Sequence, residues 1–227
     1  LTLDLHGIYK PTGINRTYPH IINFESVFGM EEVKWTDIKN NMPLYDVTFP
    51  YIRMRAMYST PASMGTRCHQ LAAYIVHDSP FTMLCDAPTN YLNEQECVDF
   101  ITSLPVETDS TFIASGELGK YIVTVRKKDV NWYVGGMTNW DRRDVELDFS
   151  FLPEGVRYTA TLFVDGINAD KQAEDYRMEK RIVDRESRMK LHLASGGGFA
   201  MKLELCPLRG RVTAVPEGKG IPSFYKK

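Results

Sequence analysis

Seven short, strand-like runs follow one another between residues 106 and 205, and they constrain the fold more than any other feature of the chain. In order, they are STFIAS, KYIVTVRK, NWYVGGMTN, VELDFSF, YTATLFVDG, RMKLHLA and GFAMKLEL. Turn-forming residues separate them at 117–119, 153–155 and 196–198. Short strands about ten residues apart, punctuated by turns, predict an antiparallel β-sandwich over residues 106–205.

The residues before this region mix strands with helices. Residues 1–6 alternate apolar and polar side chains, which is typical of a strand. Residues 66–77 carry an apolar stripe at helical spacing and predict the clearest helix of the chain. Residues 93–104 predict another helix, with Asn93 as its cap and Glu96 at the capping-box position.

Weaker patterns predict a strand at 47–52, a buried strand or a second apolar turn at 81–85, and a short helix or turn at 24–33. Strands that alternate with helices are typical of βα units, but about 100 residues are too few for the eight units of a closed barrel. We therefore expect residues 1–105 to be the C-terminal part of a (β/α)8 barrel whose earlier strands precede residue 1. The proline-containing segment 206–227 predicts a loosely packed tail.

Composition argues against several classes of partner. The net charge of −2 gives no electrostatic reason to expect nucleic acid or an anionic membrane. No apolar run approaches the roughly 20 residues of a membrane span. The four cysteines show no C-x-x-C spacing, which argues against a zinc or thioredoxin-like site. Cys68 and Cys85 lie in apolar sequence surroundings and are predicted to be buried free thiols.

An unusual density of ionisable groups follows the first strand. Glu25 and Glu31 lie six residues apart, beside the apolar residues 27, 28 and 30. A carboxyl group held against apolar neighbours has a raised pKa, as a general acid at a glycosidic oxygen requires. Paired carboxylates also suit a hard cation such as calcium. The alternative, which spacing alone favours, is that these glutamates face solvent on a helix end.

His6 and Lys10 flank Gly7 where the first strand ends. They could donate hydrogen bonds to sugar hydroxyls or steady a carboxylate; the alternative is a structurally satisfied histidine and a solvent-exposed lysine. His69, on the predicted helix, is interpreted as a packing histidine.

Three aromatic residues of the predicted sandwich, Trp132, Tyr133 and Trp140, could stack on sugar rings if they formed an exposed line. Aromatic side chains on strands are more often core or cross-strand partners, and core packing is the prediction here. Asp165-Gly166 is interpreted as a turn signal rather than a site.

The chain also contains four long motifs: HGIYKPTGINRTYPHIINFESVFGMEE, PYIRMRAM, GTRCHQLAAYIVHDSPFTMLCDAPTNY and WYVGGMTNWDRRDVELDFSFL. In these motifs the chain resembles glycoside hydrolase family 97, the bacterial α-glucosidase and α-galactosidase family. The family consists of an N-terminal β-sandwich, a central (β/α)8 barrel and a C-terminal β-sandwich. The resemblance implies that residues 1–105 end the barrel and that residues 106–205 form the C-terminal sandwich.

The resemblance also implies roles for individual residues. Glu31 matches the family's general acid, which also helps to bind calcium, and Glu25 matches a calcium ligand. His6 matches a sugar-contacting histidine, and Lys10 is a second candidate for that role. A periplasmic location and an α-linked oligosaccharide substrate are further expectations from the family.

Gly7 indicates a branch of the family. Inverting members, mainly α-glucosidases, resemble this chain but have Glu at this position, where it contributes to the base that activates water. Retaining members, typified by α-galactosidases, have Gly there and use an aspartate nucleophile from an earlier strand. Inverters separate their two carboxyl groups by about 6.5–9.5 Å and retainers by about 5–5.5 Å, so loss of a Glu here removes the inverter's base.

No aspartate of this chain matches the nucleophile, so we expect the isolated chain to lack hydrolase activity without the N-terminal part of the protein. Two alternatives remain open. The chain could belong to an α-glucosidase despite Gly7, or its sandwich could serve as a non-catalytic carbohydrate-binding or structural module.

Overall fold

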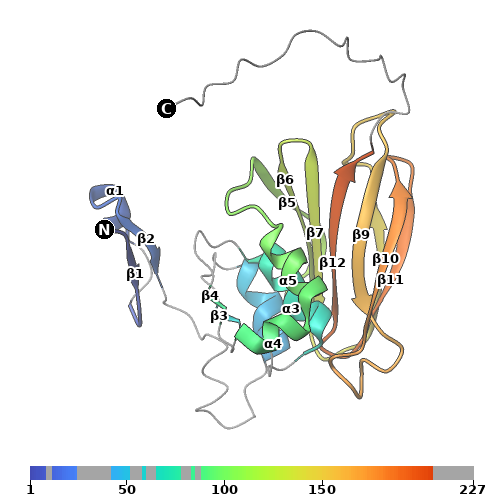
Figure 1. The fold of residues 1–227 in the computed structure, drawn as a ribbon, viewed down its shortest axis with the longest axis horizontal. Helices are drawn as coiled ribbons and strands as arrows, with labels where there is room; N and C mark the ends of the chain where they lie inside the picture. The colour runs from blue at the N-terminus through green and yellow to red at the C-terminus, as the bar shows by residue number, and fades with distance from the viewer. Residues whose placement is uncertain are drawn as a thin grey trace, which may run out of the picture.

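The computed structural model describes residues 1–8, 12–24, 42–51, 58–59, 65–77, 83–84 and 88–206 (Figure 1). Short parallel strand pairs and helices come first in the chain, and a large antiparallel sheet follows. This order confirms the predicted fold class, α/β elements followed by an antiparallel β-sandwich. No helix among these residues combines the length and apolar character needed to cross a bilayer.

Two parallel strand pairs occur in the first part. β1 (Leu3–Leu5) pairs with β2 (Ile21–Phe24), and the short helix α1 (Ile14–Thr17) lies between them in the chain. β3 (Tyr58–Ser59) pairs with β4 (Met83–Leu84). Parallel neighbours require a crossover connection, which is the βα pattern that the sequence predicts. The strands predicted at 1–6 and 81–85 are therefore confirmed within their described residues.

Six antiparallel strands form the main sheet in the order β10-β9-β12-β7-β6-β5. Their bounds are β5 Ser110–Glu117, β6 Tyr121–Lys128, β7 Asn131–Thr138, β9 Tyr158–Asp165, β10 Tyr176–Val183 and β12 Gly198–Leu205. β8 (Arg143–Asp148) and β11 (Arg188–Leu193) pair with each other as a second, two-stranded sheet. All seven strand-like runs of the sequence are strands in the structure.

The two-stranded sheet packs on one face of the main sheet. The core between them consists mainly of aliphatic side chains, including Val145, Leu147, Met189 and Leu191 from β8 and β11. Alternate residues of these two strands point inward and outward, with the burial pattern exposed–buried along β11. This alternation is the signature of a strand with one face in the core.

Helices cover the other face of the main sheet. α3 (Arg67–Val76) lies across β7 and β12, and its residues Leu71 and Ile75 are buried with Tyr133 and Phe163 of the sheet (Figure 1). Gly135 permits this close approach, because a Cβ at this position would come within 2.9 Å of the Ala72 carbonyl oxygen. The predicted helix at 66–77 is confirmed, with the Thr66 side chain accepting the cap hydrogen bond from the His69 amide.

The strand predicted at 47–52 is wrong. Residues Met42–Thr48 form the helix α2, and Phe49–Tyr51 continue as a 3-10 turn. Val47 is fully buried against α3 and the main sheet. A six-residue apolar pattern does not distinguish a strand from a helix edge, and packing against the sheet decides the outcome.

The helix predicted at 93–104 is correct in type and wrong at its start. α4 (Pro88–Asn93) is separate from α5 (Gln95–Thr102), and Glu94 rather than Asn93 is the N-cap of α5, without a side-chain cap hydrogen bond. Glu96 does not form a capping box, because Glu94 is the N-cap; its carboxylate accepts a hydrogen bond from the hydroxyl of Tyr176, at the start of β10.

Cys68 and Cys97 are buried free thiols, as predicted for Cys68. Burial raises the pKa of the Cys68 thiol well above its ordinary value, and the nearby Asp165 carboxylate adds to this. Cys85 and residues 207–227 of the predicted tail lie outside the described residues. The domain boundary near residue 105 remains a prediction.

Candidate active site

The carboxyl ends of β1 and β2 define the edge where an active site would lie. The two strands run in parallel, and Leu5 of β1 lies opposite Phe24 of β2 at their shared end. His6 comes directly after this end of β1, and its side chain is exposed. Glu25 is the next residue in the sequence after Phe24. In parallel barrels this edge carries the catalytic groups.

The four predicted site residues are described unequally. His6 is described, and it lies at the strand edge that the sequence predicts. Lys10, Glu25 and Glu31 lie outside the described residues, so their predicted roles stay predictions.

Gly7 has a left-handed backbone, with φ of +60°. L-residues with side chains rarely adopt this region, whereas glycine does so without steric cost. A Cβ added here would meet no atom within 4 Å, so space is not the constraint. The backbone conformation, rather than crowding, favours glycine directly after His6.

The described residues contain no group of three or more His, Cys, Asp or Glu side chains that could hold a metal ion. Glu25 and Glu31, the predicted calcium ligands, lie outside the described residues, so the calcium site stays a prediction that rests on the preference of this hard cation for carboxylate oxygens.

A buried polar joint connects the helical layer to the sandwich. Asp165, at the end of β9, is 6% exposed and accepts three hydrogen bonds: from the Thr66 hydroxyl at 2.6 Å and from the amides of Ala194 and Gly198, each at 2.9 Å. Burial raises the pKa of Asp165 above its ordinary value, and these hydrogen bonds offset part of the rise. The sequence interpretation of Asp165 as only a turn signal missed this role.

His69 forms the second half of the joint. Its ring is fully buried, with Nδ1 at 3.2 Å from the Gly197 carbonyl oxygen and Nε2 at 3.4 Å from Oδ2 of Asp46 on α2. Because a carbonyl oxygen only accepts, Nδ1 carries the proton in the contact with Gly197. His69 is thus a packing histidine, as the sequence predicts, but it also links α2 to the loop between β11 and β12.

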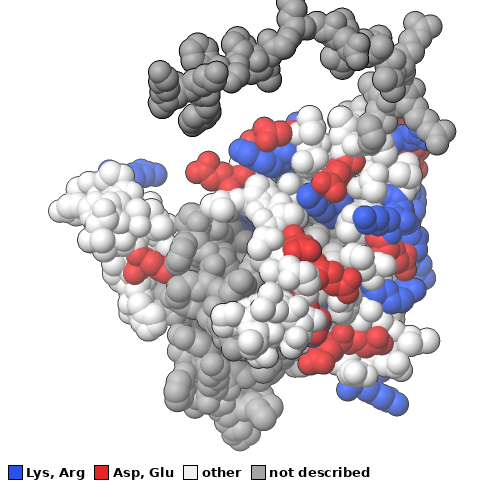
Figure 2. All heavy atoms as spheres, in the orientation of Figure 1, with Lys and Arg blue, Asp and Glu red and all other residues white. Residues whose placement is uncertain are grey.

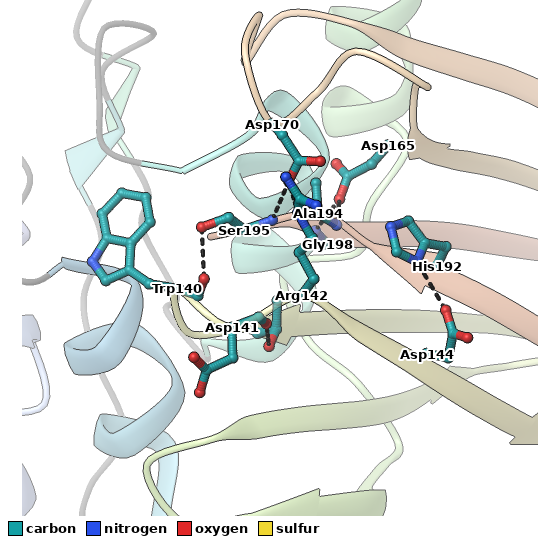
Figure 3. A network of polar contacts seen from close by, with 11 residues as sticks. Trp140, Asp141, Arg142, Asp144, Asp165, Asp170, His192, Ala194, Ser195 and Gly198 are labelled. Atoms are coloured by element: carbon teal, nitrogen blue, oxygen red, sulfur yellow. Dashed lines mark hydrogen bonds and ion pairs between the residues drawn. The ribbon is translucent and has the colours of Figure 1, made fainter.

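Polar contacts tie three loops together at the same end of the sandwich (Figure 3). The Ser195 hydroxyl donates to the Trp140 carbonyl at 2.6 Å, and Asp170 accepts from the Ser195 amide and from Nε of Arg142, each at 2.9 Å. The Trp140 indole points away from these contacts (Figure 3). These contacts connect the loops after β7, β9 and β11.

The aromatic residues do not form an exposed line. Trp132 and Tyr133 are buried, as predicted, whereas Trp140 is 42% exposed, contrary to the prediction of core packing. Trp140 lies on the loop after β7 rather than within a strand, which explains the difference. Charged side chains of both signs are interspersed over the face of the sandwich seen in Figure 2.

Comparisons with known proteins identify relatives of the chain. The family model described as "Glycosyl-hydrolase 97 C-terminal, oligomerisation" matches residues 107–204. A retaining α-galactosidase from Bacteroides thetaiotaomicron is 45% identical over 224 residues, which covers 90% of this chain and 34% of the relative.

Solved structures give the same picture. A family 97 glycoside hydrolase from Pseudoalteromonas sp. strain K8, in complex with panose, superposes with a TM-score of 0.84 and 29% identity. The same enzyme in complex with acarbose gives a TM-score of 0.82 and 30% identity. Each match covers 91% of this chain and 35% of that enzyme, so the chain spans about a third of the length of its relatives.

Proposed function

We propose that this chain, which belongs to glycoside hydrolase family 97 and corresponds to its C-terminal region, is the acid-carrying part of a retaining α-galactosidase. The identity of 45% to a retaining α-galactosidase over most of the chain supports the activity. The chain matches only a third of that relative, and in this proposal the aspartate nucleophile comes from another part of the protein.

One structural observation carries the retaining mechanism: the glycine backbone after His6. Gly7 has no side chain to act as a base, and its φ of +60° disfavours a glutamate in the same conformation. A retaining enzyme does not need a base at this position, because its second carboxylate attacks the sugar directly.

The chemistry assigned to this chain is proton transfer by Glu31. In the first step Glu31 donates its proton to the glycosidic oxygen while the aspartate nucleophile bonds to the anomeric carbon and the aglycone leaves. In the second step the Glu31 carboxylate takes a proton from water, whose oxygen bonds to the anomeric carbon and releases the aspartate. His6 and Lys10 would contact sugar hydroxyls.

Glu25 and Glu31 would together hold Ca²⁺. When bound, the cation would orient the acid and polarise the sugar site. A periplasmic location belongs to the same proposal and rests on the family resemblance.

The leaving group tests the acid role. In the full-length protein, Glu31→Gln should slow turnover of α-galactosides with poor leaving groups far more than turnover of activated aryl α-galactosides, since only poor leaving groups need protonation. Gln keeps the size of Glu but has no proton to donate. An equal loss on both substrates would argue against the acid role.

An α-glucosidase is the alternative within the family. The panose and acarbose complexes of the Pseudoalteromonas enzyme support a wider range of α-linked substrates in the family. Comparing hydrolysis of aryl α-galactoside and aryl α-glucoside by the full-length protein distinguishes the two sugars. The carbohydrate-binding alternative has less support, because Trp132 is buried and Trp140 stands alone on its loop.

Self-association of the sandwich is a second candidate function, and the edge strand β5 favours it. All residues of β5 except Ser115 are exposed, Phe112 and Ile113 among them, and Ser110–Gly116 contains no charged residue. The opposite edge, β10, carries four charged residues between 177 and 181, which discourage strand pairing. The family model that matches this region is described with oligomerisation, so we propose that β5 pairs with a second copy.

A further inference from the structure

Asp4 lies in the middle of β1, between Leu3 and Leu5, and is the only charged residue of that strand. Its Oδ1 atom is buried, and no group among the described residues donates a hydrogen bond to it. A buried carboxylate oxygen without a donor is costly, and most buried polar atoms of folded proteins have a partner. Oδ1 of Asp4 is therefore placed to accept a hydrogen bond from a group outside the described residues.

The position of Asp4 relates it to the edge where the active site is proposed. In the parallel pair of β1 and β2, Asp4 lies opposite Asn23, which is 7% exposed (Figure 1). His6 follows two residues later, at the interval at which the side chains of a strand return to the same side. Asp4 therefore lies one side-chain layer below His6, near the carboxyl end of a strand, which faces the substrate in parallel barrels.

The chemistry of the buried oxygen selects the kind of donor. An ionised carboxylate only accepts, and its hydrogen bonds are about twice as strong as those between neutral groups. A sugar ring offers several hydroxyl donors around its rim, whereas Asn23, the neighbour opposite, does not donate to Oδ1. Because a buried acceptor is paired only when the correct hydroxyl arrives, such a group rejects sugars that lack this hydroxyl.

We infer that Asp4 is a substrate-binding residue, whose Oδ1 accepts a hydrogen bond from a hydroxyl of the sugar ring next to the scissile bond. The inference rests on the proposed function, in which this strand edge belongs to an α-galactosidase site. His6, at the strand end, and Asp4, one layer deeper, would then contact different hydroxyls of the same ring. Asp4 is not the nucleophile in this assignment; it contributes binding and specificity.

The test uses three variants of the full-length protein. Asp4→Ala removes the acceptor, Asp4→Asn keeps one acceptor oxygen in a side chain of the same size, and Leu3→Ala shortens a partly buried neighbour on the same strand. kcat/KM is measured on an aryl α-galactoside and on its monodeoxy analogues, each of which lacks one sugar hydroxyl, and rates are corrected for the folded fraction. Thermal unfolding is followed with and without galactose.

Asp4→Ala should lower kcat/KM on the parent galactoside about 10–100-fold, as expected for loss of a hydrogen bond to a charged group. On the monodeoxy analogue without the partner hydroxyl, the wild type and Asp4→Ala should agree within about threefold, since the contact is absent from both. Asp4→Asn should show the same pattern with a smaller loss, and Leu3→Ala should follow the wild type on every substrate. Galactose should raise the unfolding midpoint less in Asp4→Ala than in the wild type.

An equal loss on the parent and on every analogue would overturn the inference, because this is the result expected if Asp4 accepts from another part of the protein. No loss on the parent would also overturn it, as would an unchanged effect of galactose in Asp4→Ala. Failure of the proposed function is separate, because a wild type that hydrolyses aryl α-glucosides rather than α-galactosides would contradict only the proposed sugar. The same comparison on monodeoxy α-glucosides, with glucose in the unfolding measurements, would then still test Asp4.

Discussion

The Thr66 hydroxyl donates a 2.6 Å hydrogen bond to Oδ1 of Asp165, a residue 99 positions further along the chain. The other carboxylate oxygen, Oδ2, accepts from the amides of Ala194 and Gly198. One carboxyl group therefore joins the start of α3, the end of β9 and the loop before β12. Removal of this carboxyl group should destabilise all three elements.

Asp165→Ala should lower the free energy of unfolding by about 2–5 kcal/mol, because it leaves a hydroxyl and two amides buried without an acceptor. Asp165→Asn should cost much less, since its amide oxygen can accept from Ala194 and Gly198 while its NH2 group donates to Thr66. Urea unfolding of the two variants measures the difference. Equal destabilisation by Ala and Asn would show that the hydrogen bonds do not carry the effect.

The stability contributed by Asp165 should depend on pH. Burial raises the pKa of Asp165 in the folded state above its unfolded value, so the folded state binds this proton more tightly. The contribution is then fully present below about pH 4 and is lost as pH rises through the folded-state pKa. The difference in unfolding free energy between the wild type and Asp165→Asn should shrink over that interval.

Other carboxyl groups act in the opposite direction but cancel in this comparison. The pKa of Asp144 is lowered by Lys190 and His192, and that of Asp170 by the Ser195 amide, so both favour stability above their unfolded pKa. Both groups are present in the wild type and in Asp165→Asn. A difference that grew with pH, or stayed constant, would contradict the prediction.

Gly135→Ala should lower the free energy of unfolding by about 1–3 kcal/mol. The new methyl group would lie 2.9 Å from the Ala72 carbonyl oxygen, which belongs to the backbone of α3 and cannot turn aside. Hydrogen exchange of α3 should rise together with the loss of stability. Val145→Ala, in the core on the other face of the sheet, is the control, and it should leave α3 protected in the folded state.

Ile113→Lys should weaken self-association of the protein, because a charge on β5 opposes pairing of two exposed edges. Ile113 is 48% exposed, so the substitution should change the stability of the monomer little. Ile182→Lys, on the opposite edge strand at 57% exposure, is the matched control and should leave association unchanged. Sedimentation velocity over a range of concentrations measures both; equal effects would exclude β5 as the contact.

The sandwich is predictable from sequence because its strands alternate strongly and turns separate them. β10 is the exception, since the run YRMEKRIV carries charges on an exposed edge and lacks a clear apolar alternation. The strand prediction for residues 47–52 is wrong for a different reason. Their apolar side chains are buried, but the surface that buries them comes from α3 and the main sheet, which no local pattern describes.

Only one local sequence pattern indicated the buried polar contacts of Asp165 and His69. His69 interrupts the apolar stripe of the helix 66–77, and a polar residue within such a stripe indicates a buried partner. Asp165 shows no such signal, because its three donors come from residues 66, 194 and 198. The proposed roles of Glu31 as acid and of Glu25 as calcium ligand come from the family resemblance, because the spacing of these residues alone favours solvent-facing side chains.

The packing of α3 on the main sheet limits which parts of this fold can be transferred together between genes. Tyr133, Phe163 and Ala200 of the sheet are buried with Leu71 and Ile75 of a helix that lies outside the 107–204 segment matched by the family model. A gene fusion that transferred only that segment would leave one apolar face of the main sheet exposed to solvent. The segment is therefore not a portable module, and exchange between genes should preserve it only together with the helix that precedes it.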